Sequence, residues 1–345
     1  MKKTPIIDGH IDLAWNYVAL NREFENSVEI KRNMDSKYVT QFEGIATVGY
    51  PEIKNANIRM IFATIWVESD KSLYPSLGPK YSSLKDAKVM AEEQFNYYTS
   101  LCEKNQFSLV TTKKHLKNIL YNEQYCFGIV PIIEGADFIL DEVDLNYWIK
   151  KGIRIVAPIW QKNHFGGCSE LNSGLTKKGK EFIKILSKKN IIIDIAHMSD
   201  QSINDVFKLT KSIVINSHTC CRHFCNSERM ISDKQILKIH EHNGVIGLMT
   251  WGEKLNCFCH ANIDDYINQI KHIKELTGCV DNIAIGSSMD GGYGKESLPL
   301  EMDNIGSLSL LTKALLDNSF SVKEIQQILY KNWERVLISA LDENL

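Results

Sequence analysis

The chain has 345 residues, of which 44% are hydrophobic, enough for one large α/β barrel or two average domains. Its 40 lysines and arginines nearly balance 42 aspartates and glutamates, so the basic surface that nucleic-acid binding needs is not expected. No apolar segment reaches the roughly 18 residues of a membrane span, and the first residues lack the apolar core of a secretory signal. We therefore expect a soluble cytoplasmic protein with no nucleic-acid partner and no membrane partner.

The number and spacing of the cysteines indicate whether disulfide bonds are expected. There are nine, an odd number, and three lie close together at Cys220, Cys221 and Cys225. In a large chain without a secretory signal, this usage predicts reduced thiols rather than a disulfide framework. A structural zinc site that combines them with the Cys-Phe-Cys-His segment 257–260 is not favoured, because the CxxC spacing of such sites is absent.

Short β-branched runs alternate with longer stretches of helical periodicity, which is typical of repeated βα units around a parallel sheet. Strands are predicted at Pro5–Ile7, Arg59–Ile65, Gly128–Ile133, Ile153–Pro158, Ile191–Ile195, Ile213–Asn216, Val245–Thr250 and Ile283–Gly286. Helices are predicted at Ser83–Cys102, Thr176–Lys188, Gln201–Leu209, Asp233–His242, Ile263–Thr277, Ser307–Leu316 and Val322–Leu341. Eight such units predict an α/β fold, a single (β/α)8 TIM-type barrel domain over residues 1–345 with extra C-terminal helices.

Two features of chain organisation complete this prediction. The stretch from Tyr17 to Asn55 is too long for a plain connection, so we expect a partly helical excursion over the barrel mouth. No linker or shift of composition divides the chain, which favours one domain.

Residues of metal-ligand type follow the predicted strands, at the end of a barrel where catalytic sites lie. His10 and Asp12 come after the first strand, and residues two apart on a strand point to one face, so both can reach one cation. Glu134, His197 and His218 follow the third, fifth and sixth strands. Each is a weak signal alone, since a single histidine at a strand end is usually structural. Together they are too many for one tetrahedral zinc and suit two cations that share a bridging carboxylate.

Further segments complete the pattern: Asp8–Leu13, Glu134-Gly135, Asn172–Thr176 with Gly179, Asp194–Ser199, Asn216–His218, Arg229, Gly286–Gly291 and Asn332–Leu337. His197 and His218 are 21 residues apart, which leaves room for one helix between neighbouring parallel strands, and Arg229 comes 11 residues after His218. With this order and spacing, the chain resembles the renal or membrane dipeptidase family of zinc peptidases, within the amidohydrolase-like barrels. The resemblance covers nearly the whole chain.

The resemblance implies a binuclear centre with two Zn²⁺ ions, in which His10 and Asp12 bind the first ion, His197 and His218 bind the second, and Glu134 bridges them. It also implies dipeptide hydrolysis, with a metal-bridging hydroxide attacking the peptide carbonyl. Arg229 would bind the substrate carboxylate, which suits its planar guanidinium. A homodimer is also suggested by the resemblance.

Two positions depart from the family pattern. Relatives carry a proton-handling Asp directly after the eighth strand, where this chain has Ser288, and losing general acid–base help typically costs roughly 10²–10⁴-fold in rate. Asp290 is the candidate to replace it, if the strand has not yet turned. At the end of the fourth strand, Trp160 stands where many relatives offer a histidine to the substrate. His164 is the candidate to compensate as a substrate contact, with an exposed loop histidine as the equal alternative.

The leading hypothesis is a binuclear zinc dipeptidase that acts on a dipeptide or dipeptide-like amide. Two alternatives stay open because of Ser288. The first is a diverged relative that performs a tailoring reaction on a peptide-derived metabolite, and the second is a metal-binding pseudoenzyme that acts by recognition. Metal content would not separate the three, whereas turnover of simple dipeptides would.

Overall fold

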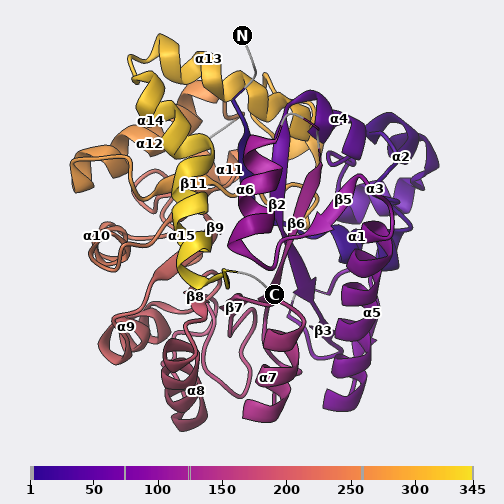
Figure 1. The fold of residues 1–345 in the computed structure, drawn as a ribbon, viewed down its shortest axis with the longest axis vertical. Helices are drawn as coiled ribbons and strands as arrows, with labels where there is room; N and C mark the ends of the chain where they lie inside the picture. The colour runs from indigo at the N-terminus through magenta and orange to yellow at the C-terminus, as the bar shows by residue number, and fades with distance from the viewer. Residues whose placement is uncertain (1–3, 74, 123, 125, 258–259, 344–345) are drawn as a thin grey trace.

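A closed ring of parallel strands forms the centre of the computed structural model, which describes residues 4–73, 75–122, 124, 126–257 and 260–343. The strands neighbour one another in the order β2-β1-β11-β10-β9-β8-β7-β6, and pairing of β2 with β6 closes the ring. Helices surround these strands (Figure 1). The ring strands are β1 (Ile6–Ile11), β2 (Ile58–Trp66), β6 (Phe127–Glu134), β7 (Ile155–Ala157), β8 (Ile192–Asp194), β9 (Val214–Thr219), β10 (Ile246–Leu248) and β11 (Ile283–Ile285). The predicted TIM-type barrel is thus confirmed.

Three ring strands continue past their predicted ends as far as a candidate ligand. β1, β6 and β9 include His10, Glu134 and His218, which were expected just after the strands. The ladders extend this far because backbone groups pair whatever the side chain is: Trp66 pairs with Glu134 and Leu248 pairs with Thr219. A polar residue at a buried strand end therefore resembles the start of a loop in the sequence.

Three short strands were not predicted. β5 (Phe107–Leu109) lies outside the ring and pairs with the first half of β6, while β3 (Glu68–Ser69) and β4 (Lys80–Tyr81) form a separate pair after β2. Segments of two or three residues carry too little periodicity to be recognised in a sequence.

The five outer helices predicted between residues 83 and 277 are present, whereas three shorter ones, at Lys113–Tyr121, Glu142–Lys150 and Gly252–Leu255, were not predicted. Several outer helices begin at a side-chain cap. Ser83, Thr176 and Asn262 each accept a hydrogen bond from the backbone N–H three residues on. The outer helices are α5 (Leu84–Cys102), α6 (Lys113–Tyr121), α7 (Glu142–Lys150), α8 (Lys177–Lys188), α9 (Asp200–Leu209), α10 (Asp233–Glu241), α11 (Gly252–Leu255) and α12 (Ile263–Thr277). None of the helices in the described part of the chain combines the length and apolar character that a membrane crossing requires.

The C-terminal helices are α13 (Leu310–Asp317), α14 (Val322–Gln326) and α15 (Asn332–Ala340), with short 3₁₀ turns at Lys295–Ser297 and Ile305–Ser309 and a π-helical turn at Gln327–Lys331. The single helix predicted over Val322–Leu341 is therefore present as one continuous helical run with a π-helical turn in its middle. The start of α15 is anchored to β11: Asn332 Nδ2 donates to Ile283 O at 2.8 Å, and Trp333 Nε1 donates to Ile285 O at 2.7 Å. Gly9 leaves room for the Trp333 indole, since a Cβ there would lie 2.5 Å from the ring.

The excursion between β1 and β2 is partly helical, as predicted. It contains α1 (Leu13–Leu20), α2 (Val28–Met34), α3 (Lys37–Glu43) and α4 (Tyr50–Asn55), and lies beside α5 in Figure 1. Two buried, positively charged side chains hold this excursion in place. Arg22 Nη2 donates to Asp35 Oδ2 at 2.8 Å and to Gly44 O at 2.7 Å, and Lys31 Nζ donates to Val48 O at 2.7 Å.

Candidate metal centre

Five predicted ligands meet at the carboxyl end of the barrel. His10 lies in β1 and Asp12 directly follows it, Glu134 ends β6, His197 follows β8, and His218 lies in β9. His10, Asp12, Glu134 and His218 are buried and His197 is half-buried. The parallel strands bring these side chains together because their carboxyl ends all open on the same face.

The carboxylate of Glu134 lies between the histidines. Its Oε2 is 3.6 Å from His10 Nε2, whereas its Oε1 is 3.0 Å from His197 Nε2 and 3.6 Å from His218 Nε2. Asp12 Oδ2 lies 3.6 Å from His10 Nε2, on the same side as Glu134 Oε2. Each oxygen of Glu134 therefore faces a different set of ligands, as a bridging carboxylate would.

The donor atoms of this cluster fit divalent cations. His197 Nε2 and His218 Nε2 lie 2.9 Å apart, and no hydrogen bond reaches Glu134 Oε1 although His197 is close. His10 Nδ1 is also buried without a hydrogen-bond partner. Ligand atoms of His10, Glu134 and His218 all lie within 4.8 Å of one another. Buried nitrogen and oxygen atoms that converge without partners are costly by themselves and are well matched to a cation such as zinc.

Burial also favours the ligand form of the two later histidines. It lowers the pKa of His197 and His218 well below the ordinary value, and the nearby positive charges of Arg229 and His10 lower both further. Neutral imidazoles are the form that binds metal. Burial raises the pKa of Glu134 to about 8, so a bound cation would have to offset the cost of its negative charge.

Residues around the ligands fix their orientation. The Thr64 hydroxyl donates to Asp12 Oδ1, and Ser217 Oγ lies 2.9 Å from His218 Nδ1. Buried Asp8 accepts the Ser287 N–H at 2.8 Å and ties β1 to the end of β11. None of these residues was assigned a role from the sequence. Ser217 and Asp8 stand within two residues of a ligand, which is a usable signal, whereas Thr64 lies inside an apolar strand and gives none.

Arg229 borders the cluster. Its Nη2 lies 3.2 Å from His197 Nε2 and donates to His218 O at 3.2 Å. Its Nη1 is buried and has no hydrogen-bond partner. A buried guanidinium N–H without an acceptor is available to a carboxylate-bearing ligand.

The segment after β11 turns away from the strand direction before Asp290. Both Ser288 and Asp290 have left-handed backbone conformations, with φ of 56° and 59°. The Ser288 N–H donates to His10 O at 3.1 Å, which places this residue beside β1. The Asp290 carboxylate accepts hydrogen bonds from Thr47 and Val48 of the excursion. The structure thus brings Ser288 next to the ligand strand and engages the Asp290 carboxylate elsewhere.

Of the two candidate substrate contacts, Trp160 and His164, only Trp160 lies beside the metal cluster. The Trp160 ring lies 6.0 Å from the His197 ring and packs edge-on against Trp66 at 4.6 Å, so it borders the metal cluster. His164 instead has its Nε2 3.2 Å from Ile139 O and its ring 4.1 Å from that of Phe165. The contacts of His164 are therefore with the surrounding loops.

The cysteine prediction needs a correction. A disulfide joins Cys225 to Cys257, with Cα atoms 5.0 Å apart, so the expectation of reduced thiols is wrong for these two residues. They are 32 residues apart but follow the neighbouring strands β9 and β10, whose loops meet at one end of the barrel. Cys220 and Cys221 are free and buried, as expected for packing thiols, and Cys259 lies outside the described residues.

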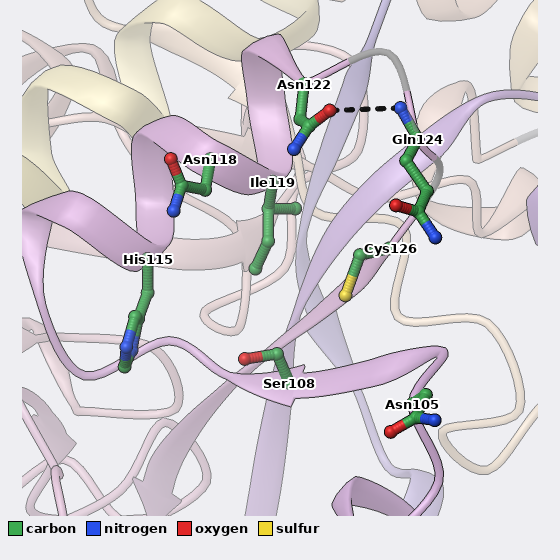
Figure 2. Close-up of a pocket in the computed structure, with 8 residues that line it drawn as sticks. All are labelled: Asn105, Ser108, His115, Asn118, Ile119, Asn122, Gln124 and Cys126. Carbon is green, nitrogen blue, oxygen red and sulfur yellow. Dashed lines mark hydrogen bonds between the residues drawn. The ribbon is translucent and has the colours of Figure 1, made fainter.

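A separate cavity of about 270 Å³ lies between β5, α6 and the residues before β6 (Figure 2). Since Cys126 directly precedes β6, this cavity is near the amino end of that strand, whereas Glu134 is at its carboxyl end. Side-chain amides dominate its lining, including Asn118 and Gln124, and no carboxylate is among its described residues. The geometry of the ligand cluster, and not this cavity, marks the candidate site.

Comparisons with known proteins identify the family to which the chain is similar. A family model described as membrane dipeptidase (peptidase family M19) matches residues 1–343. An uncharacterised protein from the pqqA 5′ region of Klebsiella pneumoniae is 27% identical over 228 residues, which cover 62% of this chain and 83% of that protein. Human dipeptidase 3 is 30% identical over 165 residues, 48% of this chain but only 33% of its own length.

Two solved structures share the fold over 98% of the chain. Dipeptidase AC, a metallopeptidase of family M19, has a TM-score of 0.81 at 19% identity, with 99% of its chain covered. A metallopeptidase from Rhodobacter sphaeroides, solved with a phosphinate mimic of the dipeptide L-Ala-D-Ala, has a TM-score of 0.81 at 18% identity, with 100% covered.

Proposed function

Because the chain belongs to the membrane dipeptidase family, peptidase family M19, we propose that it is a binuclear zinc dipeptidase that hydrolyses a dipeptide or dipeptide-like amide. The observation that carries this proposal is the position of Glu134, whose two carboxylate oxygens face His10 on one side and the His197–His218 pair on the other. One carboxylate between two ligand sets suits two cations and not one.

The ligand roles follow from these contacts. His10 and Asp12 would hold the first zinc ion, His197 and His218 the second, and Glu134 both. Bound zinc ions lower the pKa of a water molecule and polarise a carbonyl, which is the chemistry that amide hydrolysis needs. Thr64 and Ser217 would keep Asp12 and His218 oriented toward the cations.

Substrate binding is assigned to the side of the cluster where Arg229 lies. Its unpartnered Nη1 would donate a hydrogen bond to one oxygen of the substrate carboxylate, close to His197. Trp160 would form an apolar wall beside the same histidine. Its flat indole ring would pack against a side chain of the substrate, but it cannot supply the imidazole that a histidine would. A relative from Rhodobacter sphaeroides was solved with a mimic of L-Ala-D-Ala, which supports testing both L,L- and L,D-dipeptides.

A second candidate function rests on the end of β11. Ser288 has a hydroxyl instead of a carboxylate beside the ligand strand, and the Asp290 carboxylate is engaged by Thr47 and Val48. This arrangement favours a diverged relative that keeps the metal centre but acts on a different amide-like substrate, whose leaving group needs less help from a protein acid.

The experiment is amino-acid release from a panel of L,L- and L,D-dipeptides by zinc-loaded wild type, Ser288→Asp and Glu134→Gln. Turnover by the wild type that Glu134→Gln abolishes would support the dipeptidase proposal. No amino-acid release by the wild type, together with activity gained in Ser288→Asp, would support the diverged relative. No release by either the wild type or Ser288→Asp, with the metal centre loaded, would contradict the dipeptidase proposal.

A further inference from the structure

We propose that His223, Asp233 and His272 form a further transition-metal site on the outside of the barrel, separate from the candidate centre and suited to Zn²⁺ or a similar ion. Their ligand atoms all lie within 4.8 Å of one another. The three residues come from different parts of the chain: the segment after β9, the first turn of α10 and the middle of α12. The fold, and not sequence proximity, brings them together.

The side chains are already arranged around a common point. His272 Nε2 lies 2.9 Å from Asp233 Oδ1, and the His223 and His272 rings stack with centroids 4.3 Å apart and an angle of 23°. The Phe224 ring packs edge-on against both histidines, at 4.9 Å from His223 and 5.6 Å from His272. Phe224 thus packs against both of the imidazoles that would bind the ion.

The ligand set favours a transition-metal ion of intermediate softness, such as Zn²⁺. Two imidazoles and one carboxylate supply the nitrogen and oxygen ligands that zinc prefers, and a water molecule can take the fourth position of a tetrahedral site. Binding at about 2.0–2.1 Å requires the ligand atoms to move closer together. His223 is exposed, so its side chain can rotate to meet the ion, while Asp233 and His272 are half-buried.

The proposed peripheral site lies on the same segment of chain as Arg229, which borders the candidate metal centre. His223 belongs to residues 220–231, the segment that also carries Arg229. Other links already hold the segment: Arg222 pairs with Asp200 of α9 at 2.7 Å, the Cys221 N–H donates to Gln269 Oε1 of α12 at 2.6 Å, and the Cys225–Cys257 disulfide joins it to the chain after α11. A bound ion would tie it further to α10 and α12, which pack against each other. Occupancy would therefore stabilise the segment that positions Arg229.

The test uses the full protein with its central site loaded and no thiol reductant, titrated with Zn²⁺ alone. The wild type is expected to bind one more equivalent than the double variant His223→Ala/His272→Ala, or to bind it at least tenfold more tightly. His240→Ala, on α10 but outside the cluster, is the matched control and should bind like the wild type. Equal stoichiometry and affinity for the wild type and the double variant would overturn the proposal.

Two further measurements separate this site from the centre and from a loss of folding. His218→Ala, which removes a central ligand, should retain the peripheral equivalent, and its loss there would overturn the assignment of a separate site. Amide hydrogen exchange in residues 220–231 should slow when Zn²⁺ binds the wild type and should not respond in the folded single variant Asp233→Asn. Slowing of equal size in Asp233→Asn would contradict the role of this carboxylate.

Discussion

Asp290 Oδ1 accepts both the backbone N–H and the hydroxyl of Thr47, at 2.7 and 2.6 Å. Its Oδ2 accepts the Val48 N–H at 3.1 Å, and Arg22 Nη1 lies 3.9 Å from Oδ1. The carboxylate is buried, so each of these donors matters for its charge. Asp290 therefore joins the segment after β11 to the excursion that leads from β1 to β2.

We expect Asp290→Ala to lower the free energy of unfolding by about 3–5 kcal/mol, because it leaves buried donors and the Arg22 charge without their acceptor. Chemical denaturation of the metal-loaded protein measures this. Asp264→Asn, at an exposed position on α12, is the control and should change stability little. Unchanged stability with strongly reduced turnover would instead favour the proton-transfer role that the sequence suggested for Asp290.

Thr64→Val should weaken binding of the central metal ions by roughly 10–100-fold, since the Thr64 hydroxyl donates to the outer oxygen of Asp12 and fixes its direction. The substitution keeps the size and shape of the side chain, so packing in β2 should be retained. Competition with a zinc chelator measures the affinity. Thr99→Val, at a half-buried position on α5 far from the ligands, controls for the loss of a hydroxyl elsewhere. Equal affinities in all three proteins would exclude a role for Thr64.

Arg229→Lys should raise the KM for dipeptides with a free carboxylate by roughly 10–100-fold, with a much smaller effect on their C-terminal amides. The reason is the loss of a charge-assisted hydrogen bond worth about 1.5–3 kcal/mol, since an ammonium cannot reproduce the guanidinium fork. Arg222→Lys, in the same segment but paired with Asp200, is the matched control. Equal losses on both kinds of substrate would place Arg229 outside the binding pocket.

The free energy of unfolding should depend on pH through Asp303, whose carboxylate forms ion pairs with both Arg32 and Lys295. Burial would raise the pKa of this carboxyl, but Lys295, Asn304 and Arg32 outweigh it and lower the pKa to about 2. Because the folded-state value is below the ordinary 3.8, the stabilisation is present above about pH 4 and is lost as the pH falls toward 2. The side chain is 43% exposed, so solvent and salt will limit the effect to about 1 kcal/mol.

This dependence can be measured as the difference in unfolding free energy between the wild type and Asp303→Asn at several pH values. The difference should be largest above pH 4 and should shrink on acidification. Glu93→Gln, an exposed substitution on α5, should show no such trend. A difference that stays constant down to pH 2 would mean that the Asp303 charge does not anchor α2 in the folded state.

The sequence was sufficient to predict the barrel and the convergence of the five candidate ligands, because buried parallel strands leave a strong apolar pattern and each candidate ligand stands at a strand end. His10, Glu134 and His218 proved to lie within the strands, since backbone pairing continues past the last apolar residue. The partly helical excursion was also predictable from its length and polarity. Its attachment to Asp290 was not, because that contact joins residues 243 positions apart.

Features that depend on tertiary contact escaped prediction. The bond between Cys225 and Cys257 depends on two loops that meet only after the barrel closes. The grouping of His223, Asp233 and His272 likewise depends on the packing of α10 beside α12. The role of Thr64 was hidden in an apolar strand. In contrast, the divergence at Ser288 was visible at once, because the family motif fixes which position should carry the carboxylate.

The most direct test of the account is the metal content of Glu134→Gln, because this carboxylate is the one residue assigned to both ions. Measured in the His223→Ala/His272→Ala background, which removes the proposed peripheral site, the parent protein should retain two equivalents of zinc after free metal is removed. Glu134→Gln should retain less than one equivalent, whereas Glu93→Gln should match the parent. One equivalent in the parent, or undiminished content in Glu134→Gln, would contradict a binuclear centre bridged by Glu134.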